Sequence, residues 1–297
     1  MRVTFNSFRD ESLANINREA ANSGRLQAQI SSGQKISRAD EDPLTAQKIL
    51  GLQSSNAQTQ QFYNNASYAL DISRASFGAV DEVRRVSDRV GEIVAGIGEL
   101  TMPVGYQGYA AEVDSLIEQA VTSGNQRLDG NYLLGGTKTD TPPFTATRDA
   151  AGKITSVAYV GAAQGPAIQV GEASSVSPYP DGASNTEVAD FINRLVAVRD
   201  ALQSSDTAGV AAQRGGLQNS EDAVLGMLGR IGGQQRRLEL SQESASARYE
   251  ENSVRMSNYN EVDLPQAMVD LTKSQTAYQV ALQTTAKIMS KSLLDYL

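Results

Sequence analysis

The chain contains no cysteine, histidine or tryptophan among its 297 residues. Without Cys or His it cannot supply the usual zinc ligands, a thiolate nucleophile, a haem ligand or a Ser-His-Asp triad. It also cannot form disulfides, so cysteine usage does not reveal its redox compartment. Chemistry based on carboxylates, lysine or an oxygen-bound Mg²⁺ or Ca²⁺ is still open.

Aromatic residues are scarce as well, at 6% of the chain, and the mean hydropathy is −0.34. The chain is instead rich in Ala, Ser, Gln and Leu, a composition that favours long helices packed along narrow seams over one thick core. The net charge of −8 argues against nucleic-acid binding, because phosphate neutralisation needs clustered Lys and Arg. A solvated acidic surface is sufficient to explain this charge.

Long apolar runs are also absent. No run approaches the roughly 20 apolar residues of a transmembrane helix, so no membrane span is expected. The N-terminal segment MRVTFNSFRDESLAN is charged and lacks the apolar region of a Sec-type signal peptide. By this test alone, a cytosolic location is indicated.

The few prolines divide the chain. Five of the eight lie between Pro142 and Pro180, and none lies between Leu44 and Met102 or between Asp181 and Leu264. Because proline is costly inside a helix, the two proline-free stretches predict long helices. Between them, ITSVAYV (residues 154–160) and AIQV (residues 167–170) have the β-branched character of strands.

Apolar residues recur at three- and four-residue spacing along both arms, which is typical of helices packed along a seam. For the middle helices, ordinary bundle packing explains the pattern. The stripes near the chain ends are narrow and mixed with Gln, Thr, Ser and Tyr, and such a helix at a free terminus is marginal alone. We therefore expect the terminal helices to pair with each other, and then with other copies.

These patterns predict a mainly α fold, with long antiparallel helical or coiled-coil arms from both termini and a small β-rich central insertion. We expect residues 1–42 and 264–297 to form paired terminal helices. A helical bundle is expected from residues 43–134 and 185–263, and a small β-rich outer domain from residues 135–184.

Two local features could carry chemistry, and each has a simpler explanation. Asp40, Glu41 and Asp42 could bind a divalent cation, but Asp42–Pro43 is better explained as a helix start, with Asp at the N-cap and Pro at the first position. The glycine-rich stretch GMLGRIGG (residues 226–233) follows no strand, so close helix packing is favoured over phosphate binding. No residue spacing indicates an active site, so we predict no enzyme, catalytic residue, cofactor or metal.

Several motifs resemble the flagellin superfamily. ISSGQKISRADEDP (residues 30–43) is similar to its N-terminal signature, GNYLLGGTKTDTPPF (residues 130–144) to the entry into its central insertion, and RIGGQQRRLEL (residues 230–240) to the start of its long C-terminal helix. The ending LLDYL and the Asp42–Pro43 pair resemble the hook-associated members of the superfamily more than the flagellins.

The resemblance implies a structural axial protein of the bacterial flagellum that forms the junction between hook and filament. It implies a ring of copies, with hook-associated protein 1 as the proximal neighbour, flagellin as the distal neighbour, and an export chaperone on the C-terminal helix. Members leave the cell through the flagellar type III export apparatus without a cleaved signal, so the lack of a Sec signal need not mean a cytosolic location. The alternatives are flagellin itself, the filament subunit, and a coiled-coil secretion-system scaffold.

The same resemblance places assembly contacts in two groups of residues. In the signature loop they are Ile30, Ser32, Gly33, Lys35, Ile36, Asp42 and Pro43. In the terminal pair they are Phe5, Phe8, Leu13, Ile16, Leu264, Met268, Leu271, Tyr278, Leu282, Met289, Leu293 and Leu294. Two simpler possibilities stay open: the terminal helices form only an intramolecular coiled coil, and the loop is a plain connector between helices.

Overall fold

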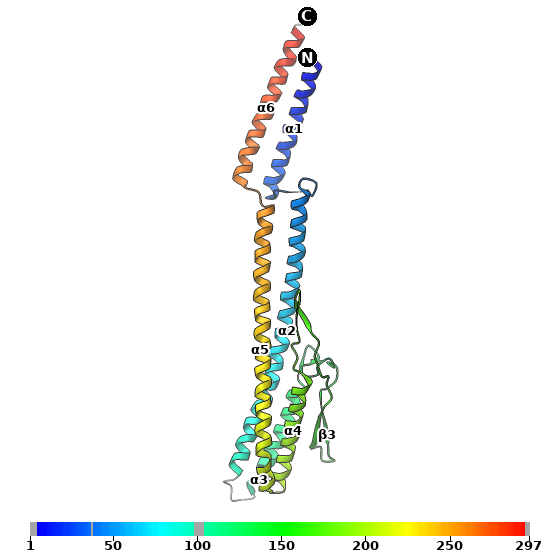
Figure 1. The fold of residues 1–297 in the computed structure, drawn as a ribbon, viewed down its shortest axis with the longest axis vertical. Coiled ribbons are helices and arrows are strands. Elements are labelled where there is room, and N and C mark those ends of the chain that lie inside the picture. The colour runs from blue at the N-terminus through cyan, green and yellow to red at the C-terminus, as the bar shows by residue number, and fades with distance from the viewer. Residues whose placement is uncertain (1–4, 37, 98–103, 295–297) are drawn as a thin grey trace. The chain divides into compact units, whose positions relative to one another are not determined.

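The computed structural model describes residues 5–36, 38–97 and 104–294, and the side chains of residues 10–36, 38–97 and 105–287. Most of this chain is helical (Figure 1). The helices are α1 (Phe5–Ser32), α2 (Pro43–Gly96), α3 (Val104–Gly124), α4 (Gly182–Gln203), α5 (Thr207–Asn260) and α6 (Leu264–Leu294).

The strands lie between α3 and α4 in sequence and form three antiparallel pairs. They are β1 (Arg127–Leu128) with β2 (Asn131–Tyr132), β3 (Phe144–Arg148) with β4 (Ile154–Tyr159), and β5 (Ile168–Gly171) with β6 (Ser174–Val176). The predicted mainly α fold with a small β-rich central insertion is therefore confirmed. Within the described residues, no helix is long and apolar enough to cross a membrane.

The start of α2 follows the local prediction. The Asp42 carboxylate accepts hydrogen bonds from the backbone N–H and the hydroxyl of Thr45, at 3.1 and 2.6 Å, and Pro43 is the first helical residue. These bonds satisfy N-terminal donors of the helix. They also hold the pKa of Asp42 below its ordinary value.

The second proline-free stretch contains two helices, α4 and α5. Ser205 adopts a left-handed backbone conformation with φ 56° directly after α4. The Asp206 carboxylate then accepts the backbone N–H of Gly209 at 2.9 Å and caps α5. A serine–aspartate turn thus ends one helix and starts the next without proline.

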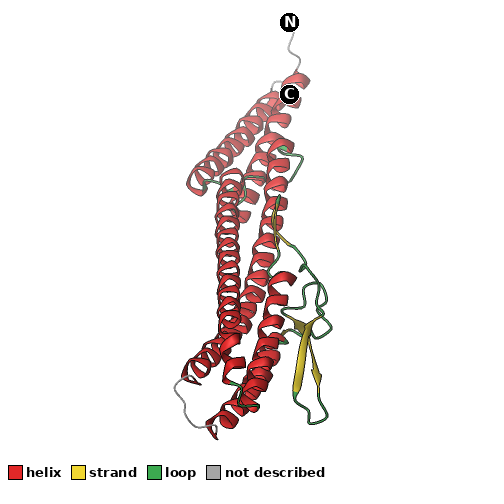
Figure 2. Ribbon diagram, turned by 60° about the horizontal axis from the view of Figure 1, so that its bottom comes forward, coloured by secondary structure: helices red, strands yellow, loops and turns green. Residues whose placement is uncertain are grey.

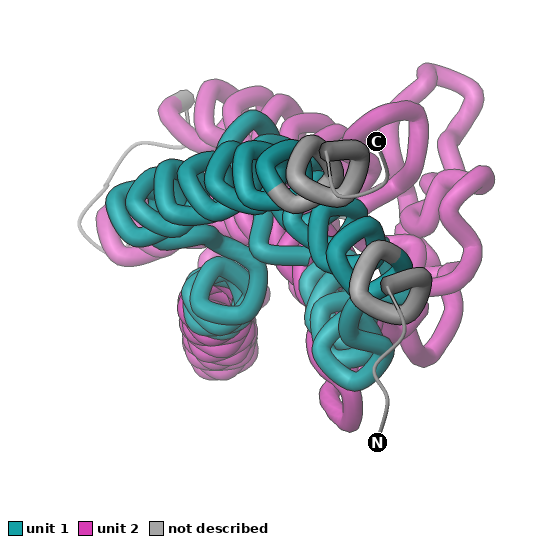
Figure 3. The backbone as a smooth tube through the Cα atoms, turned by 90° about the horizontal axis from the view of Figure 1, so that it is seen from above, with its two compact units in different colours: residues 1–58, 248–297 teal, residues 59–247 magenta. Residues whose placement is uncertain are grey.

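The chain divides into two compact units, unit 1 (residues 1–58 and 248–297) and unit 2 (residues 59–247), coloured separately in Figure 3. Helices α2 and α5 each contribute residues to both units. The three-part domain organisation expected from the sequence uses other boundaries and stays a prediction.

Unit 2 contains the main apolar core, which α2, α3, α4 and α5 build from aliphatic side chains spaced three and four residues apart. Its members include Val83, Val86, Val90, Val113, Ile117, Phe191, Leu195, Val224 and Ile231. The glycine-rich stretch of α5 behaves differently from its prediction. A Cβ atom added at Gly229, Gly232 or Gly233 would meet nothing within 4 Å, so close helix packing at these glycines is wrong within this chain.

The β3–β4 hairpin lies against α3 and α4 (Figure 2). Its residues Phe144, Ile154 and Val157 are buried in the main apolar core. The side-chain amides of two asparagines form the hydrogen bonds that a further strand would otherwise form. Asn125 bonds the backbone N–H and C=O of Phe144, and Asn193 bonds those of Val157, at 2.8 to 3.0 Å. Each amide satisfies backbone groups that a two-stranded sheet would otherwise leave unpaired.

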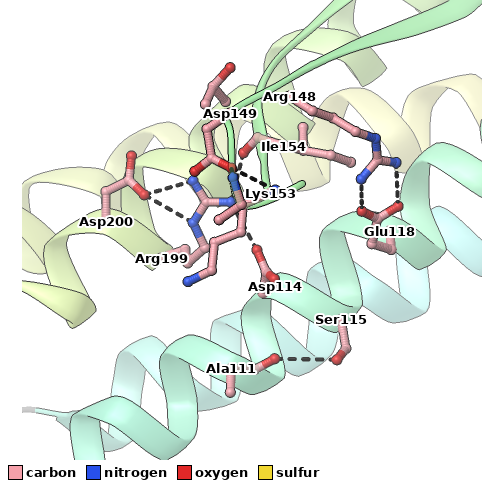
Figure 4. Close-up of polar contacts among 12 residues, drawn as sticks. Ala111, Asp114, Ser115, Glu118, Arg148, Asp149, Lys153, Ile154, Arg199 and Asp200 are labelled. Atoms are coloured by element: carbon pink, nitrogen blue, oxygen red, sulfur yellow. Dashed lines mark hydrogen bonds and ion pairs between the residues drawn. The ribbon is translucent and has the colours of Figure 1, made fainter.

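A buried arginine fastens the hairpin to the helices (Figure 4). The Arg199 guanidinium donates to Asp114 at 2.9 Å, to the Ile154 carbonyl at 2.7 Å and to Asp200 at 2.7 Å. Its side chain is only 4% exposed, so these partners compensate the loss of water around the charge. Sequence patterns gave no signal for this cluster, because Asp114 and Ile154 are distant from Arg199 in the chain.

Candidate assembly interface

Helices α1 and α6 of unit 1 pack against each other. On α1 the buried residues are Ile16, Leu26 and Gln29, and on α6 they are Ala267 and Ser274. Half-buried positions of α6 continue the same three- and four-residue spacing: Leu271, Tyr278, Ala281 and Thr285. One narrow face of α6 therefore serves the contact within the chain.

The centre of this seam is polar. Ser274 is 4% exposed, and its hydroxyl lies 2.9 Å from a Glu19 carboxylate oxygen. The Asn22 amide donates to the Ser274 hydroxyl at 3.5 Å. At this buried position, the two helices are therefore joined by hydrogen bonds and not by an apolar contact.

The sequence-predicted terminal residues fall into three groups. Ile16 is buried, and Leu271 and Tyr278 are half-buried, in the seam between α1 and α6. Four others have exposed side chains: Leu13, Leu264, Met268 and Leu282. Phe5, Phe8, Met289, Leu293 and Leu294 lie outside the residues whose side chains the structure describes.

Exposed apolar residues lie beside the seam on α6. Met268 is 59% exposed, and Leu264 and Leu282 are also largely exposed. A second file, which the sequence reading missed, carries exposed Val269 and Val280 and lines a shallow groove with Thr272, Thr276 and Ala277. The spacing of eleven residues between the two valines is the sequence pattern from which this file could have been predicted.

The signature loop joins α1 to α2 and is tied to the turn between α5 and α6. Gly33 ends α1 with φ 70°, a conformation that favours glycine, and its N–H donates to the Gln29 carbonyl at 2.8 Å. Lys35 N–H donates to the Asn260 carbonyl at 2.6 Å, and Val262 N–H donates to the Gly33 carbonyl at 3.1 Å. Two backbone bonds therefore hold the connectors together.

Side chains reinforce this crossing. The buried Gln29 amide donates to the Lys35 carbonyl at 2.6 Å. Ser32 accepts the backbone N–H of Gln34 at 3.2 Å, while Ile30 and Ile36 are half-buried. At the far end of the loop, Asp42 caps α2 and Pro43 is exposed. The loop thus has a defined structure of its own, beyond that of a flexible linker.

A cavity of about 560 Å³ lies beside the loop. Its lining includes Arg25 and Lys35 together with carboxylates from the loop and from the start of α6: Glu41, Asp42, Glu261, Asp263 and Asp270. Among the described residues, no group of three or more acidic side chains has the geometry to hold a metal ion. Asp40 pairs with Arg38 and Asp42 caps α2, so two members of the acidic cluster already have partners.

Known proteins are similar to this chain in sequence and in fold. The family model "Bacterial flagellin N-terminal helical region" matches residues 4–139. Flagellar hook-associated protein 3 of Salmonella typhimurium is 23% identical over 316 residues, covering 99% of both chains. The protein of the same name from Escherichia coli is 23% identical over 323 residues, again covering 99% of both.

A solved structure shows the same fold. The structure of Bacillus cereus FlgL matches with a TM-score of 0.60 at 16% identity, covering 71% of this chain and 99% of that one. The sequence motifs at residues 30–43, 130–144 and 230–240 agree with these similarities. The chain resembles the flagellin superfamily and, within it, flagellar hook-associated protein 3, as its sequence predicts.

Proposed function

We propose that the chain is a structural axial protein of the bacterial flagellum, which forms the junction between hook and filament by self-assembly through its terminal helices. The work of such a part is mechanical rather than catalytic. The observation that carries the proposal is the division of α6 into a face that pairs with α1 and exposed apolar files beside it. Helices of this kind are stabilised when further helices cover their apolar residues.

The intersubunit contacts belong to the exposed files. Met268 and Leu282 are exposed beside the seam, and Val269 and Val280 are exposed on the face of α6 turned away from it. Two files allow one α6 to contact two different neighbours, which is the heterologous kind of contact that generates tubes and rings. The signature loop is joined to the connector between α5 and α6 by backbone hydrogen bonds, so the two connectors of unit 1 are held together.

The junction role is favoured over the alternatives. Both curated relatives are named hook-associated protein 3 and align over nearly their whole length, which favours the junction over flagellin. A coiled-coil secretion scaffold would not carry the superfamily signature at residues 30–43. We further propose hook-associated protein 1 and flagellin as the proximal and distal neighbours, and an export chaperone on α6 before type III export.

Deletion of the gene, followed by electron microscopy, tests the function. We expect intact hooks without filaments, and flagellin released into the medium. Complementation with the full chain restores filaments, whereas a chain lacking residues 264–297 does not. Filaments of normal number and length on the deletion strain would contradict the junction role, and filaments on the truncated strain would contradict the role of α6.

A further inference from the structure

The apolar contact between α2 and α5 is interrupted inside unit 2. Leu70 on α2 and Leu238 on α5 belong to one buried cluster, together with Val170 and Val176 of the insertion. Val80 and Ile231 belong to the separate main core. The interval from Leu70 to Val80 spans about 15 Å at the helical rise of 1.5 Å per residue, so a full section of the helix pair lies between the two clusters.

Two serines of α2 occupy this section. Ser73 and Ser76 are 0% exposed, and within the described part of the chain neither hydroxyl has a hydrogen-bond partner. They are three residues apart, so both lie on one face of the helix. A buried hydroxyl without a partner carries a desolvation cost, and most such groups in proteins are bonded to protein or water.

The opposing helix leaves space here. The Gln235 side chain donates to the Ser73 carbonyl at 3.2 Å, which sets the antiparallel register and brings Gly232 opposite Ser76. A Cβ atom added at Gly232 would meet nothing within 4 Å. The side chain of Gln234 has a buried oxygen that also has no hydrogen-bond partner among the described residues. The section therefore combines polar groups with unfilled volume.

We infer that Ser73 and Ser76 bind buried water beside Gly232, and that this hydrated section allows the two apolar clusters shared by α2 and α5 to open independently. Buried polar groups beside open space are the setting in which proteins hold ordered water. Between Leu70 and Val80 the apolar side chains of α2 pack on the insertion, where Ile72 is buried with Leu133 and Tyr179. The contact between α2 and α5 therefore opens at lower cost here than in the flanking clusters. The site is separate from the terminal helices and does not depend on the proposed function.

Hydrogen exchange on the full chain tests the inference. We expect backbone amides of residues 73–77 to exchange at least about 10-fold faster than those of residues 66–70 and 80–86. The double variant Ser73→Ala with Ser76→Ala makes the section apolar but keeps the Gln235 bond to the residue 73 carbonyl, and it should slow this exchange about 10-fold. Ser87→Ala, a buried serine of the same helix beyond the section, is the matched control and should leave the rates unchanged.

A crystal structure of the full chain at high resolution gives a second measurement that does not depend on any variant. We expect ordered water within about 3.2 Å of the Ser73 or Ser76 hydroxyl. Hydroxyls that donate instead to the carbonyls of Ala69 and Ile72, with no water between the helices, would overturn the proposal. Uniform exchange along α2, or unchanged exchange in the double variant, would overturn it equally.

Discussion

The side-chain amide of Asn56 on α2 donates a hydrogen bond to the hydroxyl of Ser253 on α5, with a nitrogen–oxygen distance of 3.1 Å. The reverse bond lies next to it, from the Asn252 amide to the Ser55 hydroxyl, also at 3.1 Å. Each bond is satisfied at only one alignment of the two antiparallel helices. A single polar residue in a helix seam can specify register in this way at a cost in stability.

Replacing Asn56 with leucine should therefore raise stability. Asn56 is 7% exposed and its side-chain oxygen has no hydrogen-bond partner among the described residues, so the change removes an uncompensated polar group. Ser253 keeps its own bond to the Tyr249 carbonyl at 2.8 Å. We expect the free energy of unfolding, measured in urea, to rise by about 1 kcal/mol.

Asn64→Leu on the exposed face of the same helix is the control, and it should change the free energy of unfolding by less than about 0.5 kcal/mol. A loss of stability in Asn56→Leu would mean that the amide bond from Asn56 to Ser253 contributes more than the unpaired oxygen costs.

Two substitutions on α6 separate folding from assembly. Leu271→Asp places a charge in the half-buried seam with α1 and should lower the stability of that pairing by about 2 kcal/mol or more. Met268→Asp lies on an exposed file and should change monomer stability by less than about 0.5 kcal/mol, yet prevent assembly. Thermal unfolding followed by circular dichroism measures the first effect, and sedimentation with electron microscopy the second. Normal assembly by Met268→Asp would exclude this file as an intersubunit contact.

Local sequence signals predicted what depends on neighbouring residues. The Asp42–Pro43 helix start and the two strands near residues 154 and 168 follow from side chains within a few positions of each other. The side of each helix that packs against its partner does not follow from nearby side chains. Tyr63 and Phe77 have the spacing of seam residues along α2, yet both are exposed, while Ser73 and Ser76 are buried. Counting apolar residues misses a seam in which small side chains let helices approach.

The candidate interface shows the same limit. Apolar spacing on α6 grouped Met268 with Leu271, but the structure exposes the first and half-buries the second, because α1 covers the face centred on Ser274. Ser274 is recognisable only through its partner Glu19, which lies on a helix at the other end of the chain. The identity of the partner face is thus a tertiary property, and periodicity along one helix does not contain it.

Substitution by alanine should change the free energy of unfolding in opposite directions at two glycines. Gly136 has φ 65°, and an added Cβ atom would lie 2.8 Å from the Ala162 carbonyl oxygen and 2.9 Å from that of Gln164. Backbone atoms cannot move aside easily, so Gly136→Ala should lower the free energy of unfolding by about 1–3 kcal/mol. Gly233 lies inside α5 with open space around it, so Gly233→Ala should raise the free energy by about 0.5–1 kcal/mol.

Urea unfolding of the two variants at one pH gives both values directly. A destabilised Gly233→Ala monomer would restore the close helix packing that the sequence predicted for this stretch. A neutral Gly136→Ala variant would show that the loop before β3 adjusts without cost.

Acid should loosen the β3–β4 hairpin through Glu118. The Arg148 guanidinium forms a bidentate pair with the Glu118 carboxylate, and the hydrogen bonds and positive charge hold the pKa of Glu118 below its ordinary value of 4.5 (Figure 4). A carboxylate with a lowered pKa in the folded state stabilises the fold above its unfolded pKa. The contribution is lost as the pH falls through the folded pKa, because the unfolded chain binds the proton first.

The comparison of the wild type with Glu118→Gln measures this contribution. We expect the wild type to be slightly more stable at pH 7, since exposed ion pairs contribute little, and this difference in stability to close as the pH falls below 4.5. Glu172→Gln, which removes an exposed carboxylate of the same insertion, is the matched control. An NMR titration of the Glu118 side chain supplies the direct test, because a midpoint at or above 4.5 contradicts stabilisation of the carboxylate by Arg148.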